Sequence, residues 1–292
     1  MKTTYLFTCL LCSLLPLVLI SCTDHHEPGL DKMRVRTLTR EIPAEPGVKY
    51  ISLLQYDSQG RLGTVFTYQT PDSAISPTQA SSYQYDQQGR LSQMDRTLSQ
   101  GGSERYVYSY DQTGKPSKIR YTGADNEFYD FTFNYDSDGS LLSTRRHFNY
   151  FSALSFEQVY AYTFSLGNVS SLVSTTTVVK AVPGTSVVAT LLVYDGHPNP
   201  FYGTVLIPAP TKIGAPSTGN FGQYTYYGGI DNFLHMSKNN LVLSLVKGFS
   251  QTSYEYTYTA SGLPVSRRTL VKAMLDQPAV LQETLLYEYE KY

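Results

Sequence analysis

A short acidic segment carries the residue types that open a calcium-binding loop. Asn134, Asp136 and Asp138 alternate along the chain, and Gly139 follows them, which matches the first half of an EF-hand loop. Position 12 of such a loop holds a bidentate glutamate, but Arg145 stands there. The spacing therefore predicts no calcium site, and we expect neither a metal ion nor another cofactor.

Histidine and cysteine add little chemistry. The histidines are scattered without metal-ligand spacing: His25, His26, His147, His197 and His235. All three cysteines lie in the first 22 residues: Cys9, Cys12 and Cys22. The rest of the chain therefore has no thiol for a disulfide, a nucleophile or a zinc site.

Motifs of hydrolases and of phosphate-binding loops are also missing. The chain has no Gly-x-Ser-x-Gly, no His-Glu-x-x-His and no glycine-rich phosphate loop. We therefore expect a non-catalytic protein. The two carboxylates of a glycosidase need not be close in sequence, so a glycan-acting hydrolase with carboxylates on scattered strands stays open as the alternative.

The segment from Gly196 to Gly229 is rich in proline, glycine and aromatic residues and follows no regular pattern. Long irregular segments in a regular scaffold often carry function. We predict that this segment, with the end of the sheet that it covers, holds the ligand site. The candidate ligand residues are His197, Asn199, Phe201, Tyr202, Phe221, Tyr224, Tyr226 and Tyr227.

The elements that position these residues come from an internal repeat. The phrase Tyr-Asp-x-x-Gly begins at Tyr56, Tyr85, Tyr110 and Tyr135, in steps of 29, 25 and 25 residues. In the first two copies Arg and Leu follow, at Arg61 and at Arg90. A repeat of this kind decides the fold.

Each copy predicts one β-hairpin. Tyr106, Tyr108 and Tyr110 alternate with Val107 and Ser109, which is typical of a half-buried strand. In the turn, Asp accepts a hydrogen bond from the backbone two residues on, and Gly supplies a positive φ. The predicted turn residues are Asp57, Gly60, Asp86, Gly89, Asp111, Gly114, Asp136 and Gly139.

Weaker copies follow Tyr160 and Tyr254, where Gly167 and Gly262 remain but the aspartate is lost. Successive hairpins with short links predict an all-β fold. We expect an antiparallel meander that forms one large curved sheet or a partly closed, porin-like soluble barrel. One short helical turn is expected between Leu234 and Asn240.

The N-terminus has the pattern of a lipoprotein signal peptide. Lys2 precedes an apolar run, Leu6 to Ile20, that ends at Cys22, as in a lipobox whose cysteine is acylated. We therefore expect a signal peptide over residues 1–21, a lipidated Cys22 with a flexible tether over 22–33, and a single all-β domain over 34–292. Thr23 follows the cysteine where an inner-membrane retention signal has Asp, which favours the outer membrane.

Alternating aromatic residues are also found in transmembrane barrels. The last strand, however, has Glu288 and Glu290 on one face, which lipid would not tolerate. A lipidated N-terminus is also unnecessary for a protein that is already embedded as a barrel. We therefore favour a domain outside the bilayer.

The charge balance argues against nucleic acid as a partner. The chain has 23 basic and 24 acidic residues, and loss of Lys2 leaves 22 and 24, a net charge of −2. Half of the basic residues fall on return strands: Arg61, Arg90, Arg96, Lys115, Lys118, Arg120, Arg145, Arg146, Arg267, Arg268 and Lys272. They could form a cationic stripe for an anionic polymer. We favour cross-strand pairing with acids such as Asp111, Asp130, Glu104 and Glu127.

The chain resembles two known groups. The Tyr-Asp-x-x-Gly-Arg-Leu phrase resembles the YD repeats of Rhs-type proteins. The segment Tyr194-Asp195-Gly196-His197-Pro198-Asn199-Pro200-Phe201, with Ser237-Lys238-Asn239-Asn240 and the Tyr256 to Pro264 hairpin, resembles a family of uncharacterised lipoproteins from Bacteroidota-type bacteria. That resemblance implies a porin-like antiparallel sheet and no established activity.

Together these patterns predict a lipid-anchored outer-membrane lipoprotein that acts as a binding or scaffolding module. Its expected partners are the membrane, through the N-terminal lipid, and a glycan, an envelope component or another outer-membrane protein. The 26 tyrosines could stack on sugars, but tyrosine at every second position favours a core.

Overall fold

Each Tyr-Asp-x-x-Gly phrase ends one strand and turns the chain into the next. A computed structural model describes residues 32–72, 74, 78–99, 101–123, 128–151, 154–179, 183–203, 207–208, 225–227 and 233–292. The strands of the first half are β1 (Met33–Glu41), β2 (Lys49–Tyr56), β3 (Leu62–Thr70), β4 (Gln79–Tyr85), β5 (Leu91–Leu98), β6 (Ser103–Tyr110), β7 (Pro116–Thr122), β8 (Phe128–Tyr135) and β9 (Leu141–Phe151).

The second half has longer strands and one excursion. Its elements are β10 (Leu154–Ser165), β11 (Asn168–Val178), β12 (Gly184–Pro198), β13 (Ile207–Pro208), β14 (Thr225–Tyr227), the 3-10 helix η1 (Phe233–Met236), β15 (Asn239–Val246), β16 (Ser250–Tyr258), β17 (Pro264–Lys272) and β18 (Val280–Lys291). The helical turn η1 begins one residue before the stretch in which we expected it.

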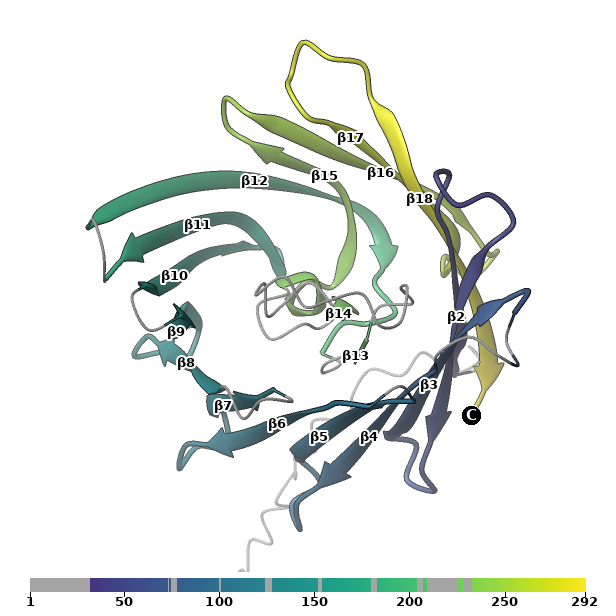
Figure 1. Ribbon diagram of the computed structural model, residues 1–292, viewed down its shortest axis with the longest axis horizontal. Coiled ribbons are helices and arrows are strands. Elements are labelled where there is room, and N and C mark those ends of the chain that lie inside the picture. Colours follow the sequence, from purple (N-terminus) through teal and green to yellow (C-terminus); the bar gives the residue numbers. More distant parts are fainter. Residues whose placement is uncertain are drawn as a thin grey trace, which may run out of the picture. The chain divides into compact units, whose positions relative to one another are not determined.

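The strands form a closed barrel, as Figure 1 shows from one end. All except β13 and β14 join the ring, in the order β1-β18-β17-β16-β15-β12-β11-β10-β9-β8-β7-β6-β5-β4-β3-β2, and every neighbouring pair is antiparallel. The prediction of an all-β antiparallel meander is confirmed. The ring closes fully, where we had expected a curved or partly closed sheet.

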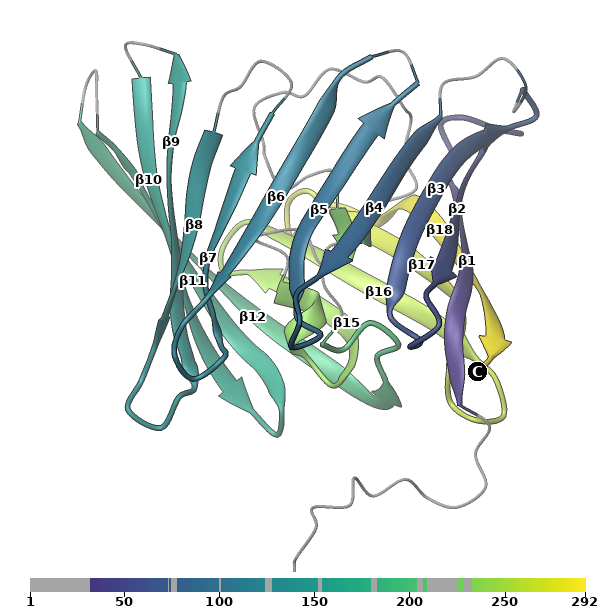
Figure 2. The same cartoon turned by 90° about the horizontal axis from the view of Figure 1, so that it is seen from below.

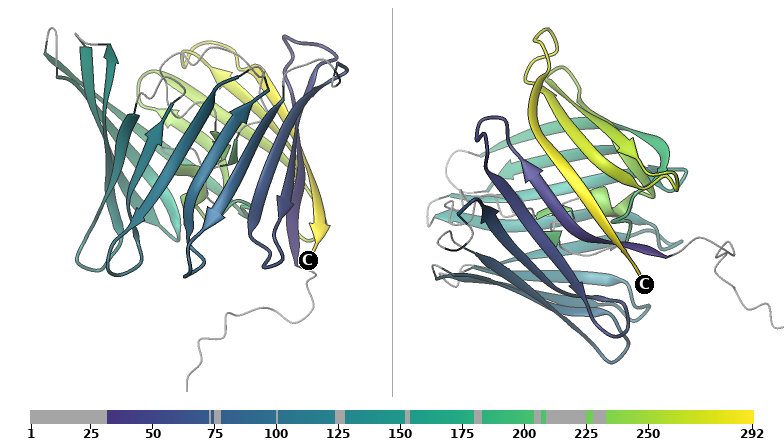
Figure 3. Two further views of the ribbon diagram at one scale, coloured as in Figure 1. Left: turned by 60° about the horizontal axis from the view of Figure 1, so that its bottom comes forward. Right: turned by 90° about the vertical axis from the view of Figure 1, so that its right-hand side faces the viewer.

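Closure occurs between the first and the last strand. β1 pairs with β2 from Thr37 to Glu41 and with β18 from Met33 to Glu41, and the two strands lie side by side in the right-hand view of Figure 3. Arg34 and Glu290 face each other in the register, and their side chains are 2.7 Å apart, Nε to Oε1. A closed ring leaves no edge strand, which removes the template for unwanted strand pairing.

The period-two pattern places tyrosine inside the ring. On β6, Tyr106 and Tyr108 are buried while Val107 between them is exposed. The inner side chains form two clusters, one along β1 to β8 with β18, and one along β10 to β16. Tyrosine therefore serves mainly as core, as its alternation predicts.

Between β12 and β15 the chain enters the interior of the barrel, whereas the other strands of the ring are joined by short connections. Figures 1 and 2 both show β13, β14 and η1 between the walls of the barrel. Phe201 is 1% exposed and belongs to the first core cluster, where its ring lies 6.4 Å from that of Tyr287 on β18. Met236 of η1 contacts the second cluster. The described residues of this excursion (199–203, 207–208, 225–227 and 233–238) therefore occupy part of the lumen.

Candidate functional site

The aspartates of the repeat organise their turns. The carboxylate of Asp57 accepts hydrogen bonds from the backbone N–H groups of Gln59 and Arg61, each 2.9 Å long, and Gly60 has a φ of +79°. Asp86, Asp111 and Asp136 accept the corresponding pairs of bonds in their own turns. These bonds satisfy the turn backbone as an Asx turn does.

The basic residue of each of the first three phrases contacts the tyrosine of the next copy, and Arg34 of β1 makes the same contact with the first copy. Arg34, Arg61 and Arg90 place their guanidinium carbons 4.0, 4.2 and 4.3 Å from the ring centroids of Tyr56, Tyr85 and Tyr110. Lys115 lies 5.3 Å from the ring centroid of Tyr135. We call this series the cation–tyrosine ladder. Each contact has cation–π geometry.

The hydroxyls of the same tyrosines donate hydrogen bonds to neighbouring strands. Tyr85, Tyr110 and Tyr135 each donate to a backbone carbonyl on the return strand of the preceding hairpin, and Tyr56 donates to the carbonyl of Val35 on β1, all at 2.6 to 2.8 Å. Tyr289 donates in the same way to Pro264. Ring face and hydroxyl are thus both used in packing, and neither faces outward toward a ligand.

At two weak copies of the repeat, the side chain against the turn glycine comes from just before the excursion, at His197, or from its last residue, Lys238. His197 stacks on Tyr258 with ring centroids 3.9 Å apart, and it lies against Gly262. Lys238 lies against Gly167, where an added Cβ would come within 2.7 Å of its side chain. His197 and Lys238 therefore fasten the two ends of the excursion to neighbouring hairpins.

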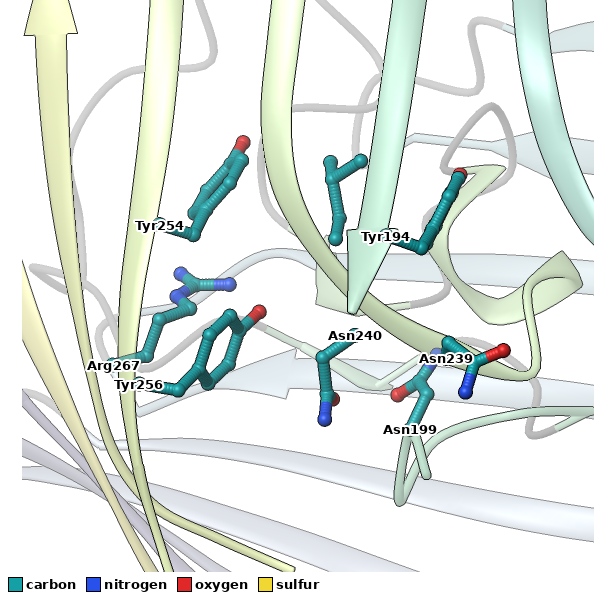
Figure 4. A pocket seen from close by; sticks show the side chains of 8 residues that line it. Tyr194, Asn199, Asn239, Asn240, Tyr254, Tyr256 and Arg267 are labelled. Atoms are coloured by element: carbon teal, nitrogen blue, oxygen red, sulfur yellow. The ribbon is translucent and has the colours of Figure 1, made fainter. Parts of the chain in front are cut away.

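A small polar cavity lies at the base of the excursion (Figure 4). Its volume is about 10 Å³, which is room for one water molecule. Asn199 comes from the excursion and Asn240 from the start of β15, while Tyr256 and Arg267 face them from β16 and β17. The remaining lining residues are Tyr194, Asn239, Leu241 and Tyr254. We call this group the lumen pocket.

Amide groups hold the two ends of the excursion together beside the lumen pocket. Asn199 donates to the carbonyl of Ser237 at 3.0 Å and accepts from the N–H of Phe201 at 3.0 Å. Asn240 donates to the carbonyl of Pro198 at 3.1 Å. The hydroxyl of Ser237, which is buried, donates to that of Tyr194 at 2.9 Å.

Arg267 brings a buried positive charge to this pocket. Its side chain is 2% exposed and lies 2.8 Å from Glu283, which also binds Arg40 at 2.7 Å and accepts from Thr269 at 3.0 Å. Burial lowers the pKa of Arg267 to about 10. Burial also raises the pKa of Glu283, against the attraction of Arg40. Both ions are therefore held in the lumen against a desolvation cost.

Burial affects the phenols of the pocket in the same direction. It raises the pKa of Tyr194 and of Tyr254 to about 12. These hydroxyls stay protonated at neutral pH and act as neutral hydrogen-bonding groups. The guanidinium of Arg267 lies 5.1 Å from the ring centroid of Tyr254. The pocket thus offers one cation, phenol and amide groups, and aromatic rings.

The remaining basic residues of the return strands divide between the two faces of the wall. Arg96, Arg146 and Arg267 are buried in the lumen, where Arg96 pairs with Glu104 and Arg146 donates to Gln158 at 2.8 Å. Arg120 and Arg268 lie outside and pair with Asp130 and Glu255, each at 2.7 Å. Cross-strand pairing, rather than one cationic stripe, describes these residues. Asp111, which we expected to pair across strands, instead accepts hydrogen bonds from Thr113 and Lys115 of its own turn, and Glu127 lies outside the described residues.

The structure brings only part of the predicted ligand segment together. Asn199 lines the lumen pocket, Phe201 packs into the core, and His197 stacks on Tyr258. Tyr202 is 49% exposed. Phe221 and Tyr224 lie outside the described residues, and for Tyr226 and Tyr227 only the backbone of β14 is described.

Residues missed by the sequence reasoning complete the pocket. Asn240 belongs to a phrase that we noted only as a resemblance, and Tyr256 and Arg267 were assigned to core and surface. Their register was the available signal, because Tyr256 pairs with Arg267 across β16 and β17 on the inward face. No group of three or more metal-ligating side chains occurs among the residues that the structure describes.

Comparisons with known proteins agree with the fold. No family model matches the chain, and no curated protein matches it. A porin-like protein from Bacteroides uniformis superposes with a TM-score of 0.54 at 15% identity, over 87% of this chain and 96% of that one. A porin-like protein from Bacteroides vulgatus gives a TM-score of 0.47 at 11% identity, over 87% and 98%. The first likeness shows the same kind of porin-like barrel.

In the part of the chain that the structure describes, no helix is long and apolar enough to cross a membrane.

Proposed function

We propose that this chain is a lipid-anchored, non-catalytic binding module of the bacterial outer membrane, with its barrel outside the hydrocarbon core. The observation that carries this proposal is the distribution of ion pairs on the outer face. Arg105 pairs with Asp95 and Arg120 with Asp130, both at 2.7 Å. A further pair, Arg145 and Glu157, lies between β9 and β10. Such charges at mid-strand are costly on a lipid-facing wall.

The filled lumen argues against an open channel. Phe201 and Met236 of the excursion pack against the inner clusters of opposite parts of the wall. Buried tyrosine side chains also line the inner face of the wall, as Tyr50 and Tyr106 do at 1% and 2% exposure. A porin-like wall therefore surrounds a core with a small polar pocket, and that arrangement suits binding better than passage of solutes.

The chemistry of the lumen pocket suits a small polar ligand such as a sugar. Asn199 and Asn240 supply amide donors and acceptors, Tyr254 and Tyr256 supply ring faces, and Arg267 supplies a charge-assisted donor. The present cavity has room for only about one water molecule, so a ligand enters only when the ends of the excursion separate. The hydrogen bonds of Asn199 and the stacking of His197 set the cost of that opening.

The alternative is a glycan-acting hydrolase. A hydrolase of that kind needs two carboxylates about 5 to 10 Å apart on either side of the bond to be cleaved. Glu283 is the most deeply buried carboxylate among the described residues, and it binds two arginines. This pairing favours a structural role for Glu283, and so the binding module is the proposal that we retain.

The test uses the full-length lipoprotein expressed in a Gram-negative host. Metabolic labelling with a tagged fatty acid should mark the wild type and not Cys22→Ala. A glycan array should then give binding that falls at least tenfold (about 1.4 kcal/mol) in Asn240→Ala and Tyr256→Ala. The outward variant Thr257→Ala, on the same strand as Tyr256, should bind as the wild type does. Equal binding by all three variants would place the ligand elsewhere, and release of a labelled reducing sugar would favour the hydrolase.

A further inference from the structure

One sector of the outer wall differs from the rest. On β12, Val187, Leu191 and Val193 are 62%, 52% and 49% exposed, while Leu192 between them is 6% exposed and belongs to an inner cluster. These aliphatic side chains therefore point outward. Large apolar side chains in contiguous exposed positions mark interaction surfaces.

Strand register makes the outward residues contiguous. Val193 pairs with Leu243 and Leu191 with Leu245 on β15, and Val173 of β11 pairs with Ala189. We call the outward residues Val173, Val187, Ala189, Leu191, Val193, Leu243 and Leu245 the aliphatic strip. Directly paired residues on one face of a sheet are about 5 Å apart, so the strip is unbroken across three strands.

The aliphatic strip is bounded by charge and contains none. β11 and β15 have no charged residue, and β12 has only Asp195, after the strip ends. The next outward ion pairs are Arg145–Glu157 on one side and Arg268–Glu255 on the other. β3 and β4 also lack charged residues, but their outward residues include Thr64, Ser82 and Gln84. The sector of β11, β12 and β15 differs in that its outward aliphatic residues adjoin one another.

We propose that the aliphatic strip rests on the hydrocarbon surface of the bilayer that carries the lipid anchor. This inference depends on the proposed lipidation of Cys22. The eleven steps from Cys22 to Met33 span at most about 40 Å when fully extended, so the anchor keeps the barrel wall within reach of lipid. Acyl anchors hold a protein firmly when a second membrane contact is present, and the strip provides one.

The composition and shape of the strip favour lipid over a protein partner. Valine, leucine and alanine make the outward apolar band of membrane barrels, whereas the cores of protein interfaces are enriched in Tyr, Trp, Met and Arg. From Val187 to Val193 the strip is about 20 Å long and covers three strands about 5 Å apart. That area is well below the roughly 800 Å² that a stable dimer buries on each partner. A convex barrel wall also meets a plane along such a narrow strip.

The test places one fluorophore at a time on the full-length lipoprotein in vesicles. The acylated chain has no free thiol, so one introduced cysteine labels uniquely. Leu191→Cys and Val187→Cys report on the strip. Gln84→Cys is the matched control, because Gln84 is exposed on β4, eight strands from β12 in either direction around the ring. Circular dichroism checks that each variant folds. If Leu191→Cys folds poorly, Val187→Cys still reports on the strip.

Quenchers attached to lipid acyl chains then distinguish the outcomes. We expect a severalfold loss of fluorescence at positions 191 and 187 and little loss at position 84. Equal quenching at all three positions would show an embedded barrel and overturn the inference, as would vesicle-bound protein with no quenching anywhere. Self-quenching at position 191 without lipid quenching would identify a second copy as the occupant. Failure of the protein to float with vesicles would instead refute the anchor itself.

Discussion

The guanidinium of Arg61 lies 4.2 Å from the ring centroid of Tyr85, the tyrosine that opens the next copy of the repeat. The same guanidinium binds Asp57 of its own turn at 2.7 Å. Arg61 therefore joins two hairpins, and its neighbours along the cation–tyrosine ladder do the same. The repeat phrase specifies contacts between hairpins as well as the hairpins themselves.

Removal of one contact of the cation–tyrosine ladder should lower the free energy of unfolding measurably. Arg61→Ala loses a partly exposed cation–π contact and an ion pair, which together contribute about 1 kcal/mol. Urea unfolding should show this loss as a lower midpoint with an unchanged slope. Arg36, which is exposed on β1, provides the control: if Arg36→Ala costs as much, the ladder has no special role.

Gly89 should resist substitution more than Gly184 does. Gly89 has a φ of +78°, so Gly89→Ala places a Cβ in the left-handed region at a cost of about 1–2 kcal/mol. Gly184 has open space for a Cβ and an ordinary φ, and Gly184→Ala should leave the stability unchanged or slightly raised. Thermal unfolding of the two variants side by side compares them. Equal losses would show that turn geometry is not the cause.

Asp111 should make the stability depend on acid pH. A hydrogen bond from the hydroxyl of Thr113, with others from the backbone of Lys115 and Thr113, lowers the pKa of Asp111. The unfolded chain then binds the proton more readily, so this contribution is present above the ordinary aspartate pKa of about 4 and is lost as the pH falls through the folded value. In Asp111→Asn, the midpoint of urea unfolding should fall less between pH 6 and pH 3 than it does in the wild type. Asp138→Asn, at an exposed turn position, should keep the wild-type profile.

The buried ion pair of Arg267 and Glu283 should show strong coupling. Glu283→Gln leaves two arginines without their carboxylate in the lumen, and breaking such a pair costs about 3–5 kcal/mol. In a double-mutant cycle with Arg267→Met the second change should cost much less. The exposed pair Arg268 and Glu255, at 51% and 55% exposure, should give a coupling of about 0–1 kcal/mol. Additive effects at Arg267 and Glu283 would contradict the pairing.

Asn199 should hold the excursion in place. Asn199→Ala removes its bonds to Ser237 and to Phe201, so amide hydrogens at Phe201 and around Ser237 should exchange faster without a change in the wall strands. Hydrogen exchange read by mass spectrometry resolves the two regions. Asn134→Ala, on the outer face of β8, should leave both regions unchanged. If the amide of Phe201 exchanges at the wild-type rate in Asn199→Ala, Asn199 does not hold the excursion in place.

Local chemistry made much of this fold predictable. Asp136 and Gly139 predict a turn, and alternating aromatic residues such as Tyr106 and Tyr108 predict a half-buried strand. Both patterns can be recognised because each lies within a few residues of sequence. Closure could not be predicted in the same way. It depends on Arg34 and Glu290, which are 256 positions apart, and on a twist and shear that no short segment encodes.

The lumen pocket was less predictable than the strands. Asn199 lay in the segment that we expected to hold a site, but Arg267 resembled the outward arginines of other return strands. Only its position relative to Tyr256 distinguishes it, since the inward face of a strand depends on register and not on residue type. The contacts of His197 and Lys238 with the turn glycines were missed because these residues come from outside the hairpins that they support.

The pairing of β1 with β18 joins strands from distant parts of the sequence. Until β18 pairs with its neighbours, β1 and β17 each present unpaired N–H and C=O groups along one edge. Contacts of such long sequence separation form slowly, and open strand edges invite aggregation. A change that weakens the pairing of β18 therefore exposes two strand edges at once, on β1 and on β17.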